Sequence, residues 1–305
     1  MTETTTAEGA AAAPVTRELH ETPGMLGLFA KAGIAMVPGA SALPGVGGVR
    51  RKDVSGDVLV LPEVTVDRGR LVAYDKVCGF TVRETLPATY PHMLAFPLHL
   101  QLMTDPTFPF PAIGLVHIDN TITVHRPLHA SETFAIAVHA EPIVDHPRGR
   151  AVAIVTQARV AGELVWEEVS TNLRLGKRNE SATAPSVTSA EDLPMTARWK
   201  LPGDLGRRYA AVSGDYNPIH VHPLTAKLLG FPSAIAHGMW TKARCLAALD
   251  ATLPDAYTVR VAFKRPVLLP AKVDYAEGDR SQSGVRFGVR DTRKGVPHLD
   301  GVVSF

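Results

Sequence analysis

The sequence predicts an α+β protein built from two similar halves. In each half, helical segments precede long segments in which apolar and polar residues alternate, as in β-strands. A polar stretch rich in Ser, Thr and Ala and interrupted by proline separates the two series. With 305 residues, 45% of them hydrophobic, the chain is long enough for two ordinary domains. We expect domains over 55–178 and 194–305, a linker over 179–193, and a flexible extension over 1–54 that contains a short helix.

The N-terminal extension carries no expected functional segment. The small residues of positions 1–20 predict disorder. The apolar residues over 25–37 predict a helix, but glycines interrupt them and the segment is too short to span a bilayer. Gly45-Val-Gly-Gly lacks the flanking strand and helix of a dinucleotide-binding loop. No secretory signal is recognisable, so we expect a cytoplasmic protein.

The first half predicts a strand and two helices ahead of its remaining strands. A strand is expected over 57–62 and a helix over 67–77, with Asp67 as its N-cap. An apolar helix follows over 94–103. Turn residues then separate segments that predict strands over 114–125, 133–140, 150–160 and 164–175.

The second half repeats this order with additional helical segments. It predicts a strand over 195–201, and its helices are expected over 205–212, 223–229 and 237–249. The chain then predicts strands over 257–265, 272–276, 284–290 and 297–305.

The charge balance and the cysteine content exclude several classes of protein. The chain has 32 basic and 30 acidic residues and no dense run of Lys or Arg. A nucleic acid or an anionic membrane is therefore not an expected partner, nor is stable membrane insertion. Two cysteines, Cys78 and Cys245, are too few for a disulfide framework and fit a reducing cytoplasm. We expect both to be core residues.

The most informative stretch runs from Tyr209 to Trp240. It places Asp215, Asn217 and His220 within six residues, and Pro218 between them prevents a regular helix or strand. Gly238 then opens an apolar helix, where a backbone N–H could face a ligand. An acid, a base and a free helix N-terminus are the groups needed to move a proton next to a carbonyl.

These motifs resemble the signature of the MaoC-like family. Ser213-Gly-Asp-x-Asn-Pro-x-His is followed by Gly230-Phe-Pro and Ile235-Ala-His-Gly-Met, with several fixed offsets. The family contains (R)-specific enoyl-thioester hydratases and 3-hydroxyacyl-thioester dehydratases with hot-dog folds. With Tyr90-Pro-x-Met-Leu-Ala-Phe-Pro-Leu and Phe108-Pro-Phe in the first half, the whole chain is similar to the double hot-dog dehydratases of actinobacteria. The resemblance implies two tandem hot dogs, each a sheet wrapped around a central helix, that form a pseudo-dimer.

The resemblance also implies the catalytic residues. Asp215 and His220 match the family's catalytic pair, Asn217 its supporting amide, and Gly238 its oxyanion-hole N–H. The implied reaction is dehydration of a (3R)-hydroxyacyl thioester, or the reverse hydration, in fatty-acid metabolism. We expect His220 to handle the hydroxyl or water proton and Asp215 the Cα proton. The implied enzyme is a hydro-lyase without cofactor or metal, and its substrate is a thioester of coenzyme A or of acyl carrier protein.

Four further residues complete the expected site. Ser213 and His237 belong to the motif, but we expect both to be structural, because such residues usually bond backbone, cap or pack. Lys264 and Arg265 follow a strand where they could bind the phosphates of the carrier; two solvated cations at a strand end are an equally good interpretation.

An internal alignment indicates a duplication in which one half lost its chemistry. Three pairs of segments match: Val77-Cys-Gly-Phe with Val212-Ser-Gly-Asp, Tyr90-Pro with Phe231-Pro, and Val124-His-Arg-Pro with Phe263-Lys-Arg-Pro. Phe80 then stands opposite Asp215, and Thr85 stands opposite His220. The same alignment sets Phe96-Pro97 against His237-Gly238. We therefore expect the first half, Phe80 included, to bind the acyl chain rather than to catalyse.

Other functions remain open at this point. A non-catalytic acyl-CoA or acyl-carrier binding protein and a hot-dog thioesterase would share the fold. A metal site of His220, His222 and His237 is disfavoured because no cysteine or carboxylate completes a recognisable ligand spacing. A serine hydrolase is disfavoured because the chain has no Gly-x-Ser-x-Gly elbow. Since two hot dogs in one chain already form the pseudo-dimer, further pairing into a homodimer is optional.

Overall fold

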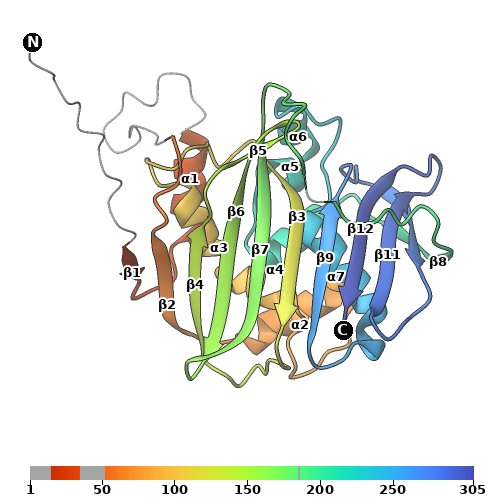
Figure 1. The fold of residues 1–305 in the computed structure, drawn as a ribbon, viewed down its shortest axis with the longest axis horizontal. Helices are drawn as coiled ribbons and strands as arrows, with labels where there is room; N and C mark the ends of the chain where they lie inside the picture. The colour runs from red at the N-terminus through yellow and green to blue at the C-terminus, as the bar shows by residue number, and fades with distance from the viewer. Residues whose placement is uncertain (1–14, 35–51, 185) are drawn as a thin grey trace, which may run out of the picture.

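The structure is a computed structural model that describes residues 15–34, 52–184 and 186–305. Its strands form one 12-stranded sheet, and its helices lie on one face of that sheet (Figure 1). The strand order is β1-β2-β4-β6-β7-β3-β9-β12-β11-β10-β8, with the short β5 paired to β6. All neighbouring pairs are antiparallel except β1 with β2.

Within its described residues the first half supplies seven strands and three helices. The strands are β1 (Thr16–Glu18), β2 (Val58–Val64), β3 (Leu115–Val124), β4 (Phe134–Ala140), β5 (Val144–His146), β6 (Gly149–Val160) and β7 (Glu163–Leu175). The helices are α1 (Met25–Ile34), α2 (Arg68–Cys78) and α3 (Tyr90–Met103).

The second half supplies five strands and five helical segments. The strands are β8 (Met195–Leu201), β9 (Tyr257–Phe263), β10 (Ala271–Glu277), β11 (Gly284–Asp291) and β12 (Pro297–Ser304). The helices are α4 (Leu205–Ser213), α5 (Pro218–Val221), α6 (Pro223–Leu228), α7 (Gly238–Leu249) and the 3₁₀ turn η2 (Asp250–Thr252).

The two halves meet where β3 pairs with β9. Asp119 lies opposite Ala262 and Val124 opposite Tyr257 in this antiparallel ladder. Outward from it, β7, β6, β4 and β2 follow on one side, and β12, β11, β10 and β8 follow on the other. The halves therefore have the same strand plan on either side of the junction, which confirms the predicted α+β architecture with two repeated units.

The long helices α3 and α7 run through the core behind the sheet. Helix α3 is buried on nearly all sides, and its buried residues include Tyr90, Met93 and Leu98. A helix that is apolar all round must be buried, which accounts for this position. The buried side chains of α7 include Met239, Trp240 and Leu246. These helices fill the space inside the curved sheet, as expected of the central helix of a hot dog.

Helices α2 and α4, which precede the long helices α3 and α7, both end at a glycine. Asp67 caps α2 by accepting a hydrogen bond from the Arg70 N–H at 2.8 Å, as predicted. Helix α2 ends at Gly79 and helix α4 at Gly214, both in the left-handed conformation that glycine adopts without steric penalty. These glycines align the two halves at the offset that the sequence indicated.

Between these glycines and the turns after β3 and β9 the predicted internal alignment is wrong, whereas in those turns Leu128 and Val267 keep the predicted register of Val124-His-Arg-Pro with Phe263-Lys-Arg-Pro. The Leu86 N–H donates to Leu128 in the first half, and the Ala236 N–H donates to Val267 in the second. Thr85 forms a single β-bridge to His129, and Ile235 forms the matching bridge to Leu268. Thr85 therefore corresponds to Ile235 and not to His220. The path from Gly214 to its bridge is fifteen residues longer than the path from Gly79. The first half consequently has no counterpart of α5 and α6.

Some predicted boundaries also differ from the structure. Helix α3 begins at Tyr90, four residues before the expected start. The prediction of disorder up to residue 20 is wrong for β1, because Thr16 pairs with Val58 in a parallel ladder and the Arg17 guanidinium bonds Asp57. The expected loop at Gly45 lies outside the described residues.

The predicted linker is packed rather than loose. Within its described part, residues 179–184 and 186–193 form no helix or strand. Yet Ala190 and Leu193 are buried, and the Ala190 N–H donates to Asp300 at 3.1 Å. The C-terminal part of this segment therefore packs on the second half, whereas Asn179 at its start bonds Asp145 of the first half. Cys78 and Cys245 are both buried and free, as expected of core residues. No helix in the described part of the chain combines the length and hydropathy needed to cross a membrane.

Candidate active site

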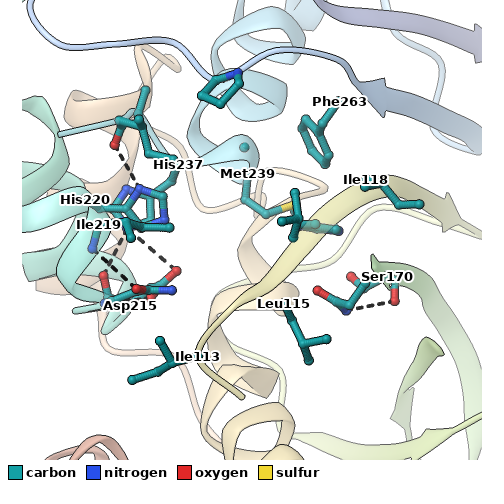
Figure 2. A pocket seen from close by; sticks show the side chains of 18 of the residues that line it. Ile113, Leu115, Ile118, Ser170, Asp215, Ile219, His220, His237, Met239 and Phe263 are labelled. Carbon is teal, nitrogen blue, oxygen red and sulfur yellow. Dashed lines mark hydrogen bonds and ion pairs between the residues drawn. The ribbon is translucent and has the colours of Figure 1, made fainter. Parts of the chain in front are cut away.

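A cavity of about 520 Å³ lies between the two halves. Its second-half wall comes from the loop after α4, the start of α7 and the end of β9, and its first-half wall comes from α3, β3 and β7. Figure 2 shows Asp215, His220 and His237 together on one side of the cavity, with Leu115 and Ser170 on the other. Among the predicted site residues, Ser213, Asn217, Gly238, Lys264 and Arg265 also line it.

Consecutive turns fix the loop that carries Asp215. The Ser213 hydroxyl oxygen accepts from the Asp215 N–H at 3.1 Å, which is the structural role expected for this serine. The Asp215 Oδ1 then accepts from the Asn217 N–H at 3.1 Å. The Asn217 side-chain oxygen accepts from the Ile219 N–H at 3.4 Å, at the start of α5. Short polar side chains favour this local bonding over regular structure, so the carboxylate has a defined position.

His220 is oriented by a hydrogen bond to the backbone. Its Nδ1–H donates to the Ile235 carbonyl at 2.8 Å, so Nε2 is the free acceptor of the neutral ring. Burial lowers the pKa of His220, and the nearby Asp215 carboxylate opposes that change. Its Nε2 is therefore the ring nitrogen that can exchange a proton at the cavity.

His237 packs directly against this residue. The two imidazole rings stack with centroids 3.7 Å apart, and the His237 Nε2–H donates to the Asp215 carbonyl at 3.0 Å. Burial, reinforced by the neighbouring His220, holds the pKa of His237 well below its usual range. Its side chain makes no cap hydrogen bond to α7. His237 thus fixes both the Asp215 backbone and one face of His220, and its expected structural role takes the form of packing.

Gly238 places a backbone N–H at the cavity. It is the first residue of α7, and the first N–H groups of a helix have no partner within the helix. A Cβ at this position would lie 3.1 Å from the Phe263 ring, so any other residue would require the ring or the helix start to shift. The positive end of the helix dipole favours a developing negative charge here.

The remaining predicted residues divide between the cavity and the rest of the molecule. Lys264 and Arg265 are exposed at the cavity, with the Lys264 Nζ 3.4 Å from an Asp300 carboxylate oxygen. Phe80 follows the cap glycine Gly79 and packs against the hydrophobic core. The structure does not bring it to the cavity wall.

The structure does not assemble the three-histidine metal site. His222 is exposed, and its Nδ1 accepts from the Leu224 N–H at 3.1 Å, where it caps α6. Asp215, His220 and His237 do place potential ligand atoms within 4.8 Å of one another. However, backbone carbonyls already engage the His220 Nδ1 and the His237 Nε2. This arrangement suits proton transfer by the carboxylate and the His220 Nε2.

Sequence reasoning missed a second group of polar residues at the cavity. His92, His99 and His117 line the first-half wall, with Glu168 buried behind them. The sequence contained a signal for this group, because His92 and His99 lie seven residues apart on an apolar helix and therefore share one face. The first half thus lacks the Asp215 and His220 chemistry but is not an apolar lining.

Comparisons with known proteins identify the family and the fold. A family model described as "MaoC like domain" matches residues 180–301. The 3-hydroxyacyl-thioester dehydratase X of Mycobacterium tuberculosis is 38% identical over 268 residues, which cover 87% of this chain and 94% of that relative. The crystal structure of HtdX from the same organism superposes with a TM-score of 0.72 at 36% identity, covering 81% of this chain and 98% of that one.

A more distant likeness supports the fold alone. Another Mycobacterium tuberculosis protein, described as having a double hot-dog fold, superposes with a TM-score of 0.55 at 12% identity. That match covers 82% of this chain and 95% of that one. The two repeated units joined at β3 and β9 therefore form a double hot dog.

Proposed function

The chain belongs to the MaoC-like dehydratases with a double hot-dog fold, and from that membership we propose that Asp215 and His220 carry out its hydro-lyase chemistry. The substrate is a (3R)-3-hydroxyacyl thioester, and the reverse reaction hydrates a trans-2-enoyl thioester. One observation carries the proposal: the Asp215 carboxylate, the His220 ring and the N-terminal residue of α7 line the same side of one cavity. A base, an acid and an oxyanion donor are the groups that this elimination requires.

In the dehydration direction each group has one task. Asp215 removes the C2 proton, and the electrons of that bond form the C2–C3 double bond. His220, as the imidazolium, protonates the departing C3 hydroxyl, which leaves as water. The Gly238 N–H stabilises the negative charge that develops on the thioester oxygen. The proton taken from C2 then passes from Asp215 to His220, which restores the starting protonation states of the pair.

The shape of the cavity fits an extended acyl thioester. Lys264 and Arg265 stand at the exposed end, where they bind the phosphates of coenzyme A or of the carrier's pantetheine. The acyl chain extends toward the first half, where the apolar wall residues include Met93, Phe96, Leu100, Met103 and Leu115. Each buried methylene contributes roughly 0.8 kcal/mol. The cytoplasmic location and the optional pairing of two chains stay predictions.

The test is the ultraviolet absorbance of the conjugated enoyl thioester. Purified protein is mixed with crotonyl-, octenoyl- or dodecenoyl-CoA, beside the Asp215→Asn variant. Loss of absorbance with wild type alone supports hydration at this site, and the ranking of substrates reports chain length. If the coenzyme A thioesters do not react, the acyl carrier protein thioesters are tested. Failure with both carriers contradicts the proposal and favours a binding protein.

A further inference from the structure

The first-half wall of the cavity contains a preorganised polar cluster. We define it as His92 of α3, His117 of β3 and Ser170 of β7, which line the cavity, with Glu168 and Asn120 behind them. Ser170 lies across the cavity from Asp215 and His220 (Figure 2). The catalytic scheme gives none of these residues a task.

The cluster is tied together by short hydrogen bonds. Glu168 is fully buried, and its carboxylate accepts from the His92 Nδ1–H at 2.8 Å and from the Asn120 amide at 2.6 Å. The same amide donates to the Ser170 hydroxyl oxygen at 2.9 Å. The Asn120 side-chain oxygen accepts from the Lys242 ammonium at 2.5 Å. The network therefore runs from α7 through the sheet to the cavity surface.

The charges in the network favour a fixed arrangement. Burial alone would raise the pKa of Glu168, but His92 and the Asn120 hydrogen bond lower it to about 2. Burial lowers the pKa of Lys242 to about 7 against the attraction of Glu168. Burial also lowers the pKa of His117 to about 3, so this ring is neutral at physiological pH. Glu168 is thus a buried carboxylate that orients His92, as a carboxylate orients a histidine in catalytic and metal sites.

Two polar groups of the cluster remain available at the wall, and a third is buried without a partner among the described residues. With its Nδ1 bonded to Glu168, His92 has an Nε2 without a hydrogen-bond partner among the described residues. The His117 Nε2 is buried and has no partner in the described part of the chain. The Ser170 hydroxyl accepts one hydrogen bond, which leaves its own hydrogen free to donate.

A cavity wall that contacted only the methylene groups of an acyl chain would not need polar side chains. Burying a charge or leaving a polar atom unpaired costs free energy, and an apolar side chain of similar size would avoid that cost. Tying α7 to the sheet explains Lys242 and Asn120, but it explains neither the Nε2 of His92 nor that of His117. The His92 Nε2, on a side chain that lines the cavity, calls for a ligand with a hydrogen-bonding group.

We propose that this cluster is a subsite for an oxygen substituent, a hydroxyl or a carbonyl, on the acyl chain beyond C3. His92 and Ser170 hydrogen-bond the substituent while the thioester occupies the Gly238 end of the cavity. The inference rests on the proposed function, because the thioester position sets the direction of the chain. It assigns the first half a role in selecting oxygenated acyl thioesters.

The experiment compares substrates that differ only in the substituent. The kcat/KM for hydration is measured with trans-2-dodecenoyl-CoA and with its hydroxyl and oxo derivatives, substituted at successive carbons along the chain. At least one derivative should exceed the plain chain by about tenfold with wild type. Either His92→Phe or Ser170→Ala should bring that ratio close to one. The control is His139→Phe, since His139 lies on β4 outside the cavity and its side chain bonds the partly exposed Glu141.

Two further measurements distinguish failure of the proposed subsite from failure of the proposed hydratase activity. Calorimetric binding of saturated hydroxylated and plain acyl-CoA to Asp215→Asn tests the subsite even if wild type hydrates nothing. Ser170→Ala removes a single oxygen, so it tests the subsite should His92→Phe fail to fold. Wild type that binds or turns over every oxygenated chain no better than the plain one would overturn the proposal. So would a preference that survives both substitutions in folded protein.

Discussion

The imidazole rings of His220 and His237 stack at 3.7 Å, and the second ring hydrogen-bonds the backbone carbonyl of Asp215. One buried histidine thus positions both members of the proposed catalytic pair. His237 is inside the motif, but its contribution is geometric, because its Nε2–H is already engaged and its pKa is held well below the usual range.

We therefore expect His237→Phe to lower kcat by about tenfold while KM changes little. Phenylalanine keeps the stacking on His220 but cannot donate to the Asp215 carbonyl. His237→Ala, which loses both contacts, should be slower still. Steady-state kinetics with an enoyl-CoA substrate, together with a thermal unfolding check, measures the difference. Equal kcat for His237→Phe and wild type would show that the hydrogen bond does not position Asp215.

The proposed acid–base pair predicts large losses on substitution. Asp215→Asn and His220→Ala should each lower kcat by several orders of magnitude, because proton transfer at C2 or at the hydroxyl is lost. Both side chains are at the cavity wall, so the fold should persist. Circular dichroism is the control for folding. Turnover near the wild-type rate in both variants would mean that other residues carry the chemistry.

Gly238→Ala should impair turnover by displacing the start of α7. The new Cβ would lie 3.1 Å from the Phe263 ring, so either the ring or the helix start must shift. Because an oxyanion donor acts only when correctly placed, we expect a loss in kcat of roughly 10²-fold. Gly203→Ala is the matched control, since its Cβ would make an ordinary contact of 3.9 Å with Pro270. Equal losses in the two variants would argue against a special role for Gly238.

The pH profile tests how the two protons are divided. If His220 donates the hydroxyl proton, it must be protonated in the free enzyme, and burial lowers its pKa below the ordinary 6.5. The kcat/KM should therefore fall as pH rises through that lowered pKa, with faster turnover at about pH 5.5 than at about pH 7.5. A flat profile over this interval would favour Asp215 alone carrying the proton from C2 to the hydroxyl.

The buried histidines predict loss of stability in acid. Burial lowers the pKa of His99 to about 3, whereas the unfolded chain binds its proton near 6.5. The contribution is therefore fully present above pH 6.5 and is lost as pH falls toward 3. Burial raises the pKa of Asp75 to about 7, so this residue changes the free energy of unfolding with pH in the opposite direction. The test therefore compares how stability changes with pH in wild type and in variants, not the absolute stability of wild type.

The measurement is urea unfolding of wild type and His99→Gln between about pH 7.5 and pH 5. Glutamine can still bond Thr156, the present partner of His99 at 2.7 Å, but it does not titrate. The free energy of unfolding should decline less steeply with acid in the variant. His139→Gln, at a partly exposed position on β4, is the control for the substitution itself. An unchanged slope in His99→Gln would rule out this contribution.

The sequence by itself determined the features that depend on local chemistry. Asp67 as a helix cap, Gly79 and Gly214 as helix ends, and the turns around Asp215 all involve residues within a few positions of one another. Strand alternation predicted nearly all the strands of both halves, and the fixed spacing of the motif indicated the family. Such features can be read from the sequence because neighbours in the chain are neighbours in space.

Only the tertiary structure decided how distant segments meet. The alignment failed between Gly79 and the start of α3 because the second half contains α5 and α6, and only hydrogen bonds such as that from Leu86 to Leu128 show the correct equivalence there. His92 and Glu168 are 76 residues apart, and their contact depends on how β7 pairs with β3 beneath α3. The first-half wall of the cavity therefore depends on burial and on strand register across the sheet, which no local sequence pattern encodes.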